Sequence, residues 1–129
     1  MTFDIDKLAD SLEKACPQAV FALLHGSAKN GFVREGADVD IAVYIEGKPD
    51  FEFYRRAYAA VSSVAAGAEP DVGILNRAEP VYRFEALKGR LLFSRDMEKY
   101  LDFFSLTCRL YEGQMADYQR QWEYRRNRD

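Results

Sequence analysis

Two apolar segments, each next to a short polar motif, constrain the fold of this chain more than any other feature. The first segment, residues 19–24, is followed after one histidine by Gly26 and Ser27. Ten residues separate Ser27 from Asp38, and Asp38 and Asp40 stand at the head of the second apolar segment. Because alternate side chains of a strand point to the same face, the two aspartates share a face, with Cα atoms roughly 6.5–7 Å apart. Two carboxylates at that spacing can bind one hard cation or bridge two.

The motifs at these two segments favour a site for a metal ion and a nucleotide. A glycine followed by a serine lets a phosphate approach the backbone closely. Magnesium prefers one or two carboxylates together with the phosphates of a substrate. We therefore interpret Gly26, Ser27, Asp38 and Asp40 as parts of one site.

The hydrophobic periodicity predicts helices and strands in alternation. The expected elements are a helix over 4–15, strands over 18–25 and 38–46, a helix over 50–65, a strand over 70–75, a helix from Pro80 to just before Gly89, an edge strand over 91–93 and a C-terminal helix over about 100–125. This order predicts an α/β (α+β) fold with a small mixed sheet flanked by helices.

A third carboxylate lies on the expected strand 70–75, at Asp71. If this strand pairs beside strand 38–46, Asp71 joins the other two aspartates. A third carboxylate can share a second metal ion and accept the proton of an attacking hydroxyl. Two cations about 3.5–4 Å apart then clamp the attacking and leaving oxygens of an in-line displacement. Without metal, the three anions would raise one another's pKa.

The pattern Gly-Ser, ten residues, Asp-x-Asp resembles the DNA polymerase β-like nucleotidyltransferase superfamily, and in particular its minimal nucleotidyltransferase (MNT) antitoxins. The resemblance covers about residues 20–104 and implies the nucleotidyltransferase fold. Members commonly contain Phe-Gly-Ser-Arg-Ala-Arg-Gly, whereas residues 25–31 are His-Gly-Ser-Ala-Lys-Asn-Gly, which leaves Lys29 as the only nearby cation. In the third strand, members often contain Asp-Leu-Val-Asp-Leu-Asn; here the first aspartate is Asp71 and the second is replaced by Ile74.

The resemblance implies a function and a partner. The expected reaction moves AMP from MgATP to a hydroxyl, that of a tyrosine on a HEPN-domain ribonuclease toxin, so that the chain acts as antitoxin in a type VII-like toxin–antitoxin pair. Two alternatives stay open. One is a small-molecule nucleotidyltransferase that modifies aminoglycosides, although the second domain that usually forms the drug pocket is missing. The other is a non-catalytic antitoxin that acts by binding alone.

The resemblance also implies roles for single residues. Asp38 and Asp40 are expected to bind two Mg²⁺ ions, with Mn²⁺ as a substitute, and Asp71 to ligate one ion and act as the base. The residues expected to bind the phosphates of ATP are Gly26, Ser27 and Lys29.

Composition narrows the class of protein further. The 129 residues, with 48% hydrophobic and 30% charged side chains, predict one soluble domain spanning 1–129. A net charge of −3 argues against a general nucleic-acid binder. No run is long and apolar enough for a membrane span, and the N-terminal segment does not have the pattern of a signal peptide. Cys16 and Cys108, without a CxxC motif, predict two free thiols and a cytoplasmic protein.

The C-terminal helix carries an apolar seam with spacings of three and four. Its members are Leu101, Phe104, Cys108, Tyr111, Met115, Tyr118 and Trp122. We expect the first half of the seam to pack in the domain, as does a second strip of Phe103, Leu106 and Leu110. Beyond Gly113 we expect the seam to extend past the domain and to offer a homo- or hetero-oligomeric contact. The end of the helix, residues 124–128, is basic, which suits the helix dipole.

Overall fold

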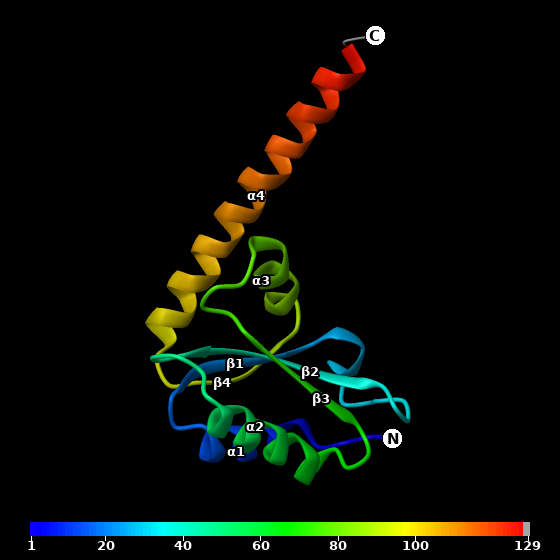
Figure 1. Ribbon diagram of the computed structural model, residues 1–129, viewed down its shortest axis with the longest axis vertical. Coiled ribbons are helices and arrows are strands. Elements are labelled where there is room, and N and C mark those ends of the chain that lie inside the picture. Colours follow the sequence, from blue (N-terminus) through cyan, green and yellow to red (C-terminus); the bar gives the residue numbers. More distant parts are fainter. Residues whose placement is uncertain (128–129) are drawn as a thin grey trace.

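The computed structural model describes residues 1–127 and contains a four-stranded sheet with helices on both faces (Figure 1). The elements are α1 (Ile5–Ala15), β1 (Ala19–His25), the 3₁₀ turn η1 (Gly26–Ala28), β2 (Asp38–Ile45), α2 (Phe51–Val64), β3 (Glu69–Ile74), α3 (Pro80–Leu87), β4 (Arg90–Ser94) and α4 (Met97–Asn127). Each predicted helix and strand is present, with bounds that differ by up to three residues. Arg128, in the predicted basic end, lies outside the described residues.

The strand order of the sheet is β3-β2-β1-β4. Strand β1 pairs antiparallel with both β2 and β4, whereas β2 and β3 run parallel. A parallel pair needs a crossover connection, and helix α2 provides it. The predicted mixed sheet is therefore confirmed, with β4 as an edge strand beside β1.

Helices α1 and α2 cover one face of the sheet, and α3 and the start of α4 cover the other (Figure 1). Side chains of the central strand β1 alternate between the two resulting cores: Ala22 and Leu24 pack toward α1 and α2, while Phe21 and Leu23 pack toward α3 and α4. Because both faces of β1 are covered, this strand is a nearly continuous apolar segment.

Side-chain caps fix where two of the helices begin. The Asp4 carboxylate accepts hydrogen bonds from the backbone N–H groups of Asp6 and Lys7 at the start of α1. The Asp50 carboxylate accepts from the backbone N–H of Phe53 at the start of α2. Each cap satisfies backbone donors that have no partner within the helix.

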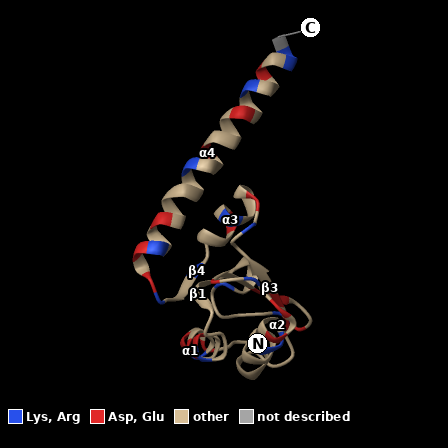
Figure 2. Ribbon diagram, turned by 60° about the vertical axis from the view of Figure 1, so that its left-hand side comes forward, with Lys and Arg blue, Asp and Glu red and all other residues tan. Residues whose placement is uncertain are grey.

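Helix α4 extends well beyond the sheet and its covering helices (Figure 1). Its 31 residues correspond to a length of about 46 Å. Along its described part, Phe103 and Thr107 are the buried side chains. Figure 2 shows Lys and Arg as well as Asp and Glu positions spread along α4, separated by uncharged residues. No helix within residues 1–127 is long and apolar enough to cross a membrane.

The predicted packing of the first half of α4 was wrong in part. Leu106 and Leu110, expected to face the domain, are 43% and 42% exposed, and Leu101 and Phe104 of the seam are also exposed. The face that contacts the domain is instead centred on Phe103 and Thr107, while Tyr111 stacks on the ring of Phe84 with 3.9 Å between centroids. Apolar periodicity shows that a helix has a face that packs on the domain. It does not show which of several neighbouring faces does so. Here the selected face contains a polar threonine.

Candidate functional site

The register of the parallel strands brings the three predicted carboxylates together. Asp40 of β2 lies opposite Asp71 of β3, and Asp38 lies two residues before Asp40 on the same face. One carboxylate oxygen from each of Asp38, Asp40 and Asp71 lies within 4.8 Å of the others. A set of three carboxylate oxygens at this spacing is a donor set suited to hard divalent cations.

The Gly-Ser turn lies directly against this cluster. His25, the last residue of β1, pairs with Asp40 in the antiparallel register, and the chain then enters the η1 turn. Gly26 has a φ of 73°, in the left-handed region that favours glycine. A Cβ at Gly26 would also overlap the carboxylate of Asp40. The glycine is therefore required both by the backbone conformation and by the close approach of the carboxylate.

Burial and neighbouring groups disfavour ionisation of the Asp40 carboxyl. Burial, together with the hydrogen bond to Asp71 and the charges of Asp71 and Asp38, raises the pKa of Asp40 from 3.8 to about 6. Partial burial and clustered negative charge both disfavour the ionised form. A divalent cation would remove much of this repulsion.

The raised pKa of Asp40 predicts a pH-dependent stability of the metal-free protein. Because the folded state binds this proton more tightly than the unfolded state, the destabilisation is fully present above pH 6. It is relieved as the pH falls through about 6 toward 4. The melting temperature of Asp40→Asn, measured in EDTA, should therefore exceed that of the wild type most at pH 7–8 and least near pH 4. An equal difference at every pH would contradict the assignment.

A histidine and a tyrosine form a wall beside the carboxylates. The Tyr82 hydroxyl of α3 lies 3.4 Å from Nε2 of His25, and the two rings meet edge to face. A Cβ at Gly73 of β3 would overlap that hydroxyl, so the tyrosine rests on the strand that carries Asp71. Burial lowers the pKa of the His25 imidazole and raises the pKa of the Tyr82 phenol, which keeps both groups neutral. Sequence reasoning missed Tyr82, because it resembles any other apolar residue of an amphipathic helix.

The three residues predicted to bind phosphate differ in their distance from the carboxylate cluster and from a nearby hollow. Gly26 adjoins the carboxylate cluster. The next residue, the exposed Ser27, lines a hollow of about 570 Å³ at the turn. Lys29, the C-cap residue of η1, is exposed and is not among the residues lining that hollow. Arg34, which sequence reasoning missed, does line it. In the sequence, the only sign of a role for Arg34 was its position in the loop between the Gly-Ser motif and the Asp-x-Asp motif.

Comparison with known proteins assigns the chain to a family. Residues 6–98 match the family described as Polymerase beta, Nucleotidyltransferase. Since this match covers more than two thirds of the chain, the chain belongs to the polymerase β nucleotidyltransferase family, as the motifs predicted. No curated protein sequence matches the chain.

Several solved structures share the fold over nearly the whole chain. A mutant of the toxin-antitoxin MntA-HpeT matches with a TM-score of 0.74 and 21% identity, covering 93% of this chain and 96% of that chain. A toxin-antitoxin with AMP-PNP matches with a TM-score of 0.71 and 21% identity, over 93% and 96% of the two chains. A structure of a tri-AMPylated Shewanella oneidensis HEPN toxin in complex with MNT antitoxin matches with a TM-score of 0.67 and 21% identity, over 92% of each chain. The predicted nucleotidyltransferase fold is thus confirmed.

Proposed function

We propose that this chain, acting as one nucleotidyltransferase domain over residues 1–129, transfers AMP from MgATP to a tyrosine of a HEPN-domain ribonuclease toxin and so acts as its antitoxin. The observation that carries the proposal is the convergence of Asp38, Asp40 and Asp71 beside the Gly-Ser turn. Family membership supports nucleotidyl transfer. The chain shares its fold with a chain from a complex of an MNT antitoxin and a HEPN toxin in which the toxin is AMPylated. This similarity supports a HEPN toxin as the partner and as the acceptor of AMP.

The carboxylates fit a pair of magnesium ions, with manganese as a substitute. Three carboxylate oxygens within 4.8 Å, one of them on a carboxyl whose pKa is raised by burial and by its neighbours, form a site that gains by binding cations. Such ions would neutralise phosphate charge and polarise the α-phosphate. Asp38 and Asp40 are the residues that would hold both ions, and Asp71 would ligate one of them.

The chain's own residues would position the substrates and move one proton. The hydroxyl oxygen of the acceptor forms a bond to the α-phosphorus of ATP while the bond from this phosphorus to the bridging oxygen breaks and pyrophosphate leaves. Asp71 accepts the hydroxyl proton. The hydroxyl of Ser27 and the backbone N–H groups at Gly26 and Ser27 would donate hydrogen bonds to the leaving phosphates.

Labelled ATP separates this reaction from the alternatives. The protein, purified together with the HEPN protein expressed beside it, should transfer label from [α-³²P]ATP but not from [γ-³²P]ATP to a tyrosine of the partner when Mg²⁺ is present. Inhibition of the partner without label transfer would show an antitoxin that acts by binding alone. Label on an aminoglycoside instead would show a small-molecule enzyme.

The Gly-Ser turn yields a second test. We expect Ser27→Ala to lower the transfer rate on the order of 10²-fold, as for the loss of one preorganised hydrogen-bond donor. Gly26→Val should lower it further, since its Cβ would overlap the Asp40 carboxylate and the backbone φ is 73°. Initial rates of label transfer, with circular dichroism as a control for folding, measure both effects. Normal turnover by both variants would mean that the turn has no role in binding phosphate.

A further inference from the structure

A hollow of about 570 Å³ lies at the Gly-Ser turn and the loop that leads to Asp38. Its lining residues are Ser27, Phe32, Arg34 and Ala37. Two of these are joined in the chain to the site already described: Ser27 belongs to η1, and Ala37 immediately precedes Asp38. The ring of Phe32, 53% exposed, forms part of the wall. The hollow is therefore connected through the chain to both the Gly-Ser turn and the start of β2.

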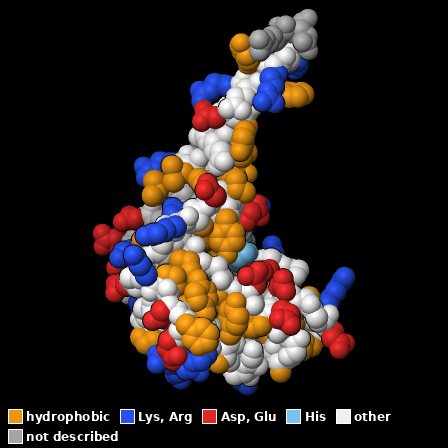
Figure 3. Space-filling model, in the orientation of Figure 1, with side chains coloured by type: hydrophobic (Ala, Val, Ile, Leu, Met, Phe, Trp, Pro, Cys, Tyr) orange, Lys and Arg blue, Asp and Glu red, His pale blue; other side chains and the backbone are white. Residues whose placement is uncertain are grey.

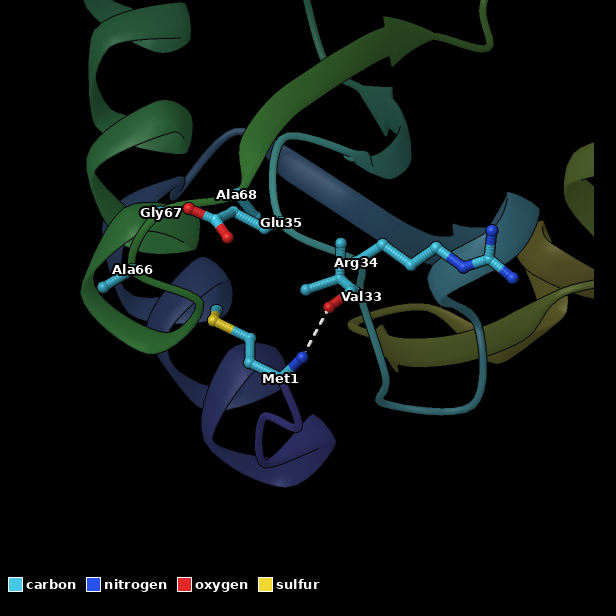
Figure 4. A pocket seen from close by; sticks show the side chains of 7 residues that line it. All are labelled: Met1, Val33, Arg34, Glu35, Ala66, Gly67 and Ala68. Carbon is cyan, nitrogen blue, oxygen red and sulfur yellow. Dashed lines mark hydrogen bonds between the residues drawn. The ribbon is translucent and has the colours of Figure 1, made fainter.

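Arg34 supplies the one formal charge among the residues that line this hollow. Within residues 1–127, no ion pair or side-chain hydrogen bond is recorded for its guanidinium, whereas Arg55 and Arg56 pair with Glu52. Arg34 also lines a neighbouring pocket of about 340 Å³ together with Met1 and Glu35, and Figure 4 shows its exposed side chain extending away from these two residues. The guanidinium is thus exposed and available to a ligand in the larger hollow.

The negative charge of a bound triphosphate requires a cationic side chain such as that of Arg34. A nucleoside triphosphate brings several negative charges to a site that already holds three carboxylates, so the phosphates beyond the reach of metal ions need a cation from the protein. Lys29 is not among the residues that line the hollow, but Arg34 is. A guanidinium also presents a planar array of donors that matches two phosphate oxygens at once.

We propose that Arg34 is the phosphate-binding cation of this chain, and that its guanidinium holds the terminal phosphates of ATP in the hollow between Ser27 and Ala37. The inference rests on the proposed function and adds to it a residue that selects triphosphates over monophosphates. Because the contact is made to the β- and γ-phosphates, AMP does not benefit from it.

Calorimetric titration of the full chain with α,β-methylene-ATP and Mg²⁺, and separately with AMP, tests the inference without turnover. We expect Arg34→Ala to weaken binding of the triphosphate analogue about tenfold or more, as for the loss of a charge-assisted hydrogen bond. Binding of AMP should stay unchanged. Lys48→Ala is the matched control: it removes the same formal charge from an exposed side chain after β2, at the other end of that strand from Asp38, and should change binding less than about twofold. Arg34→Lys should restore part of the affinity.

The outcomes separate this inference from the proposed function. Unchanged binding of the analogue by Arg34→Ala, equal losses in Arg34→Ala and Lys48→Ala, or an equal loss for AMP would each overturn the role of Arg34. If the wild-type protein does not bind the analogue at all, the proposed function fails together with the inference. Circular dichroism melting should show the wild-type transition for Arg34→Ala, since no recorded intramolecular bond of its side chain is lost.

Discussion

Replacing Asp38 and Asp40 together by alanine is expected to abolish nucleotidyl transfer, lowering the rate by about 10³-fold or more. Loss of the metal-binding carboxylates removes several kcal/mol of stabilisation of the charge that develops on the phosphates. The fold should remain intact and the metal-free protein should become equally or more stable, because the burial and the repulsion that raise the pKa of Asp40 are both removed. Single-turnover transfer from [α-³²P]ATP and thermal melting measure the two effects.

Glu69→Ala is the matched control for that experiment. Glu69 lies opposite Asp38 in the parallel register and is exposed, but it is not one of the three clustered carboxylates. Removing its charge should leave the transfer rate within about twofold, because an exposed charge interacts weakly through water. Retained transfer in the double alanine variant would refute the assignment of the active site.

Replacing Tyr118 and Trp122 by alanine is expected to weaken binding to the partner protein by at least about 30-fold, since a truncated aromatic anchor costs about 2 kcal/mol at an interface. These side chains are 55% and 64% exposed on the part of α4 that extends beyond the sheet. In Figure 3, hydrophobic side chains recur along the extended part of α4, between charged ones. A stripe of this kind favours a contact with another chain.

The effect of the aromatic pair should be confined to assembly. Pull-down of the partner and light scattering of the protein alone measure hetero- and homo-oligomers separately. Binding of α,β-methylene-ATP should be unchanged, because Tyr118 and Trp122 are exposed and follow the segment of α4 that packs on the domain. Gln121→Ala, on the same turn of the helix and exposed, is the control for a change at this place without loss of an aromatic ring. Unchanged assembly of the double variant would show that the seam does not bind a partner.

The local motifs and the elements that carry them followed from the sequence. The alternation of a strand places Asp38 and Asp40 on one face whatever the strand packs against. The apolar run within residues 18–25 was predicted as a strand, and Pro80 and Gly89 bounded the helix that became α3. These predictions held because they depend on backbone geometry and on the burial of neighbouring residues in the chain.

The tertiary structure decided which distant residues meet. Asp71 reaches Asp40 because β2 and β3 pair in parallel in one register of several that their sequences permit, and a shift by one residue would point Asp71 to the other face. Arg34 lines the hollow because the path of the loop over residues 29–37 places it there, and nothing in the periodicity of the sequence specifies that path. The face of α4 that packs on the domain was set by the shape of its neighbours, which accept Phe103 and Thr107 and leave Leu106 and Leu110 exposed. Sequence patterns act over one turn or one strand, whereas register, loop path and choice of helix face are determined by packing across the whole fold.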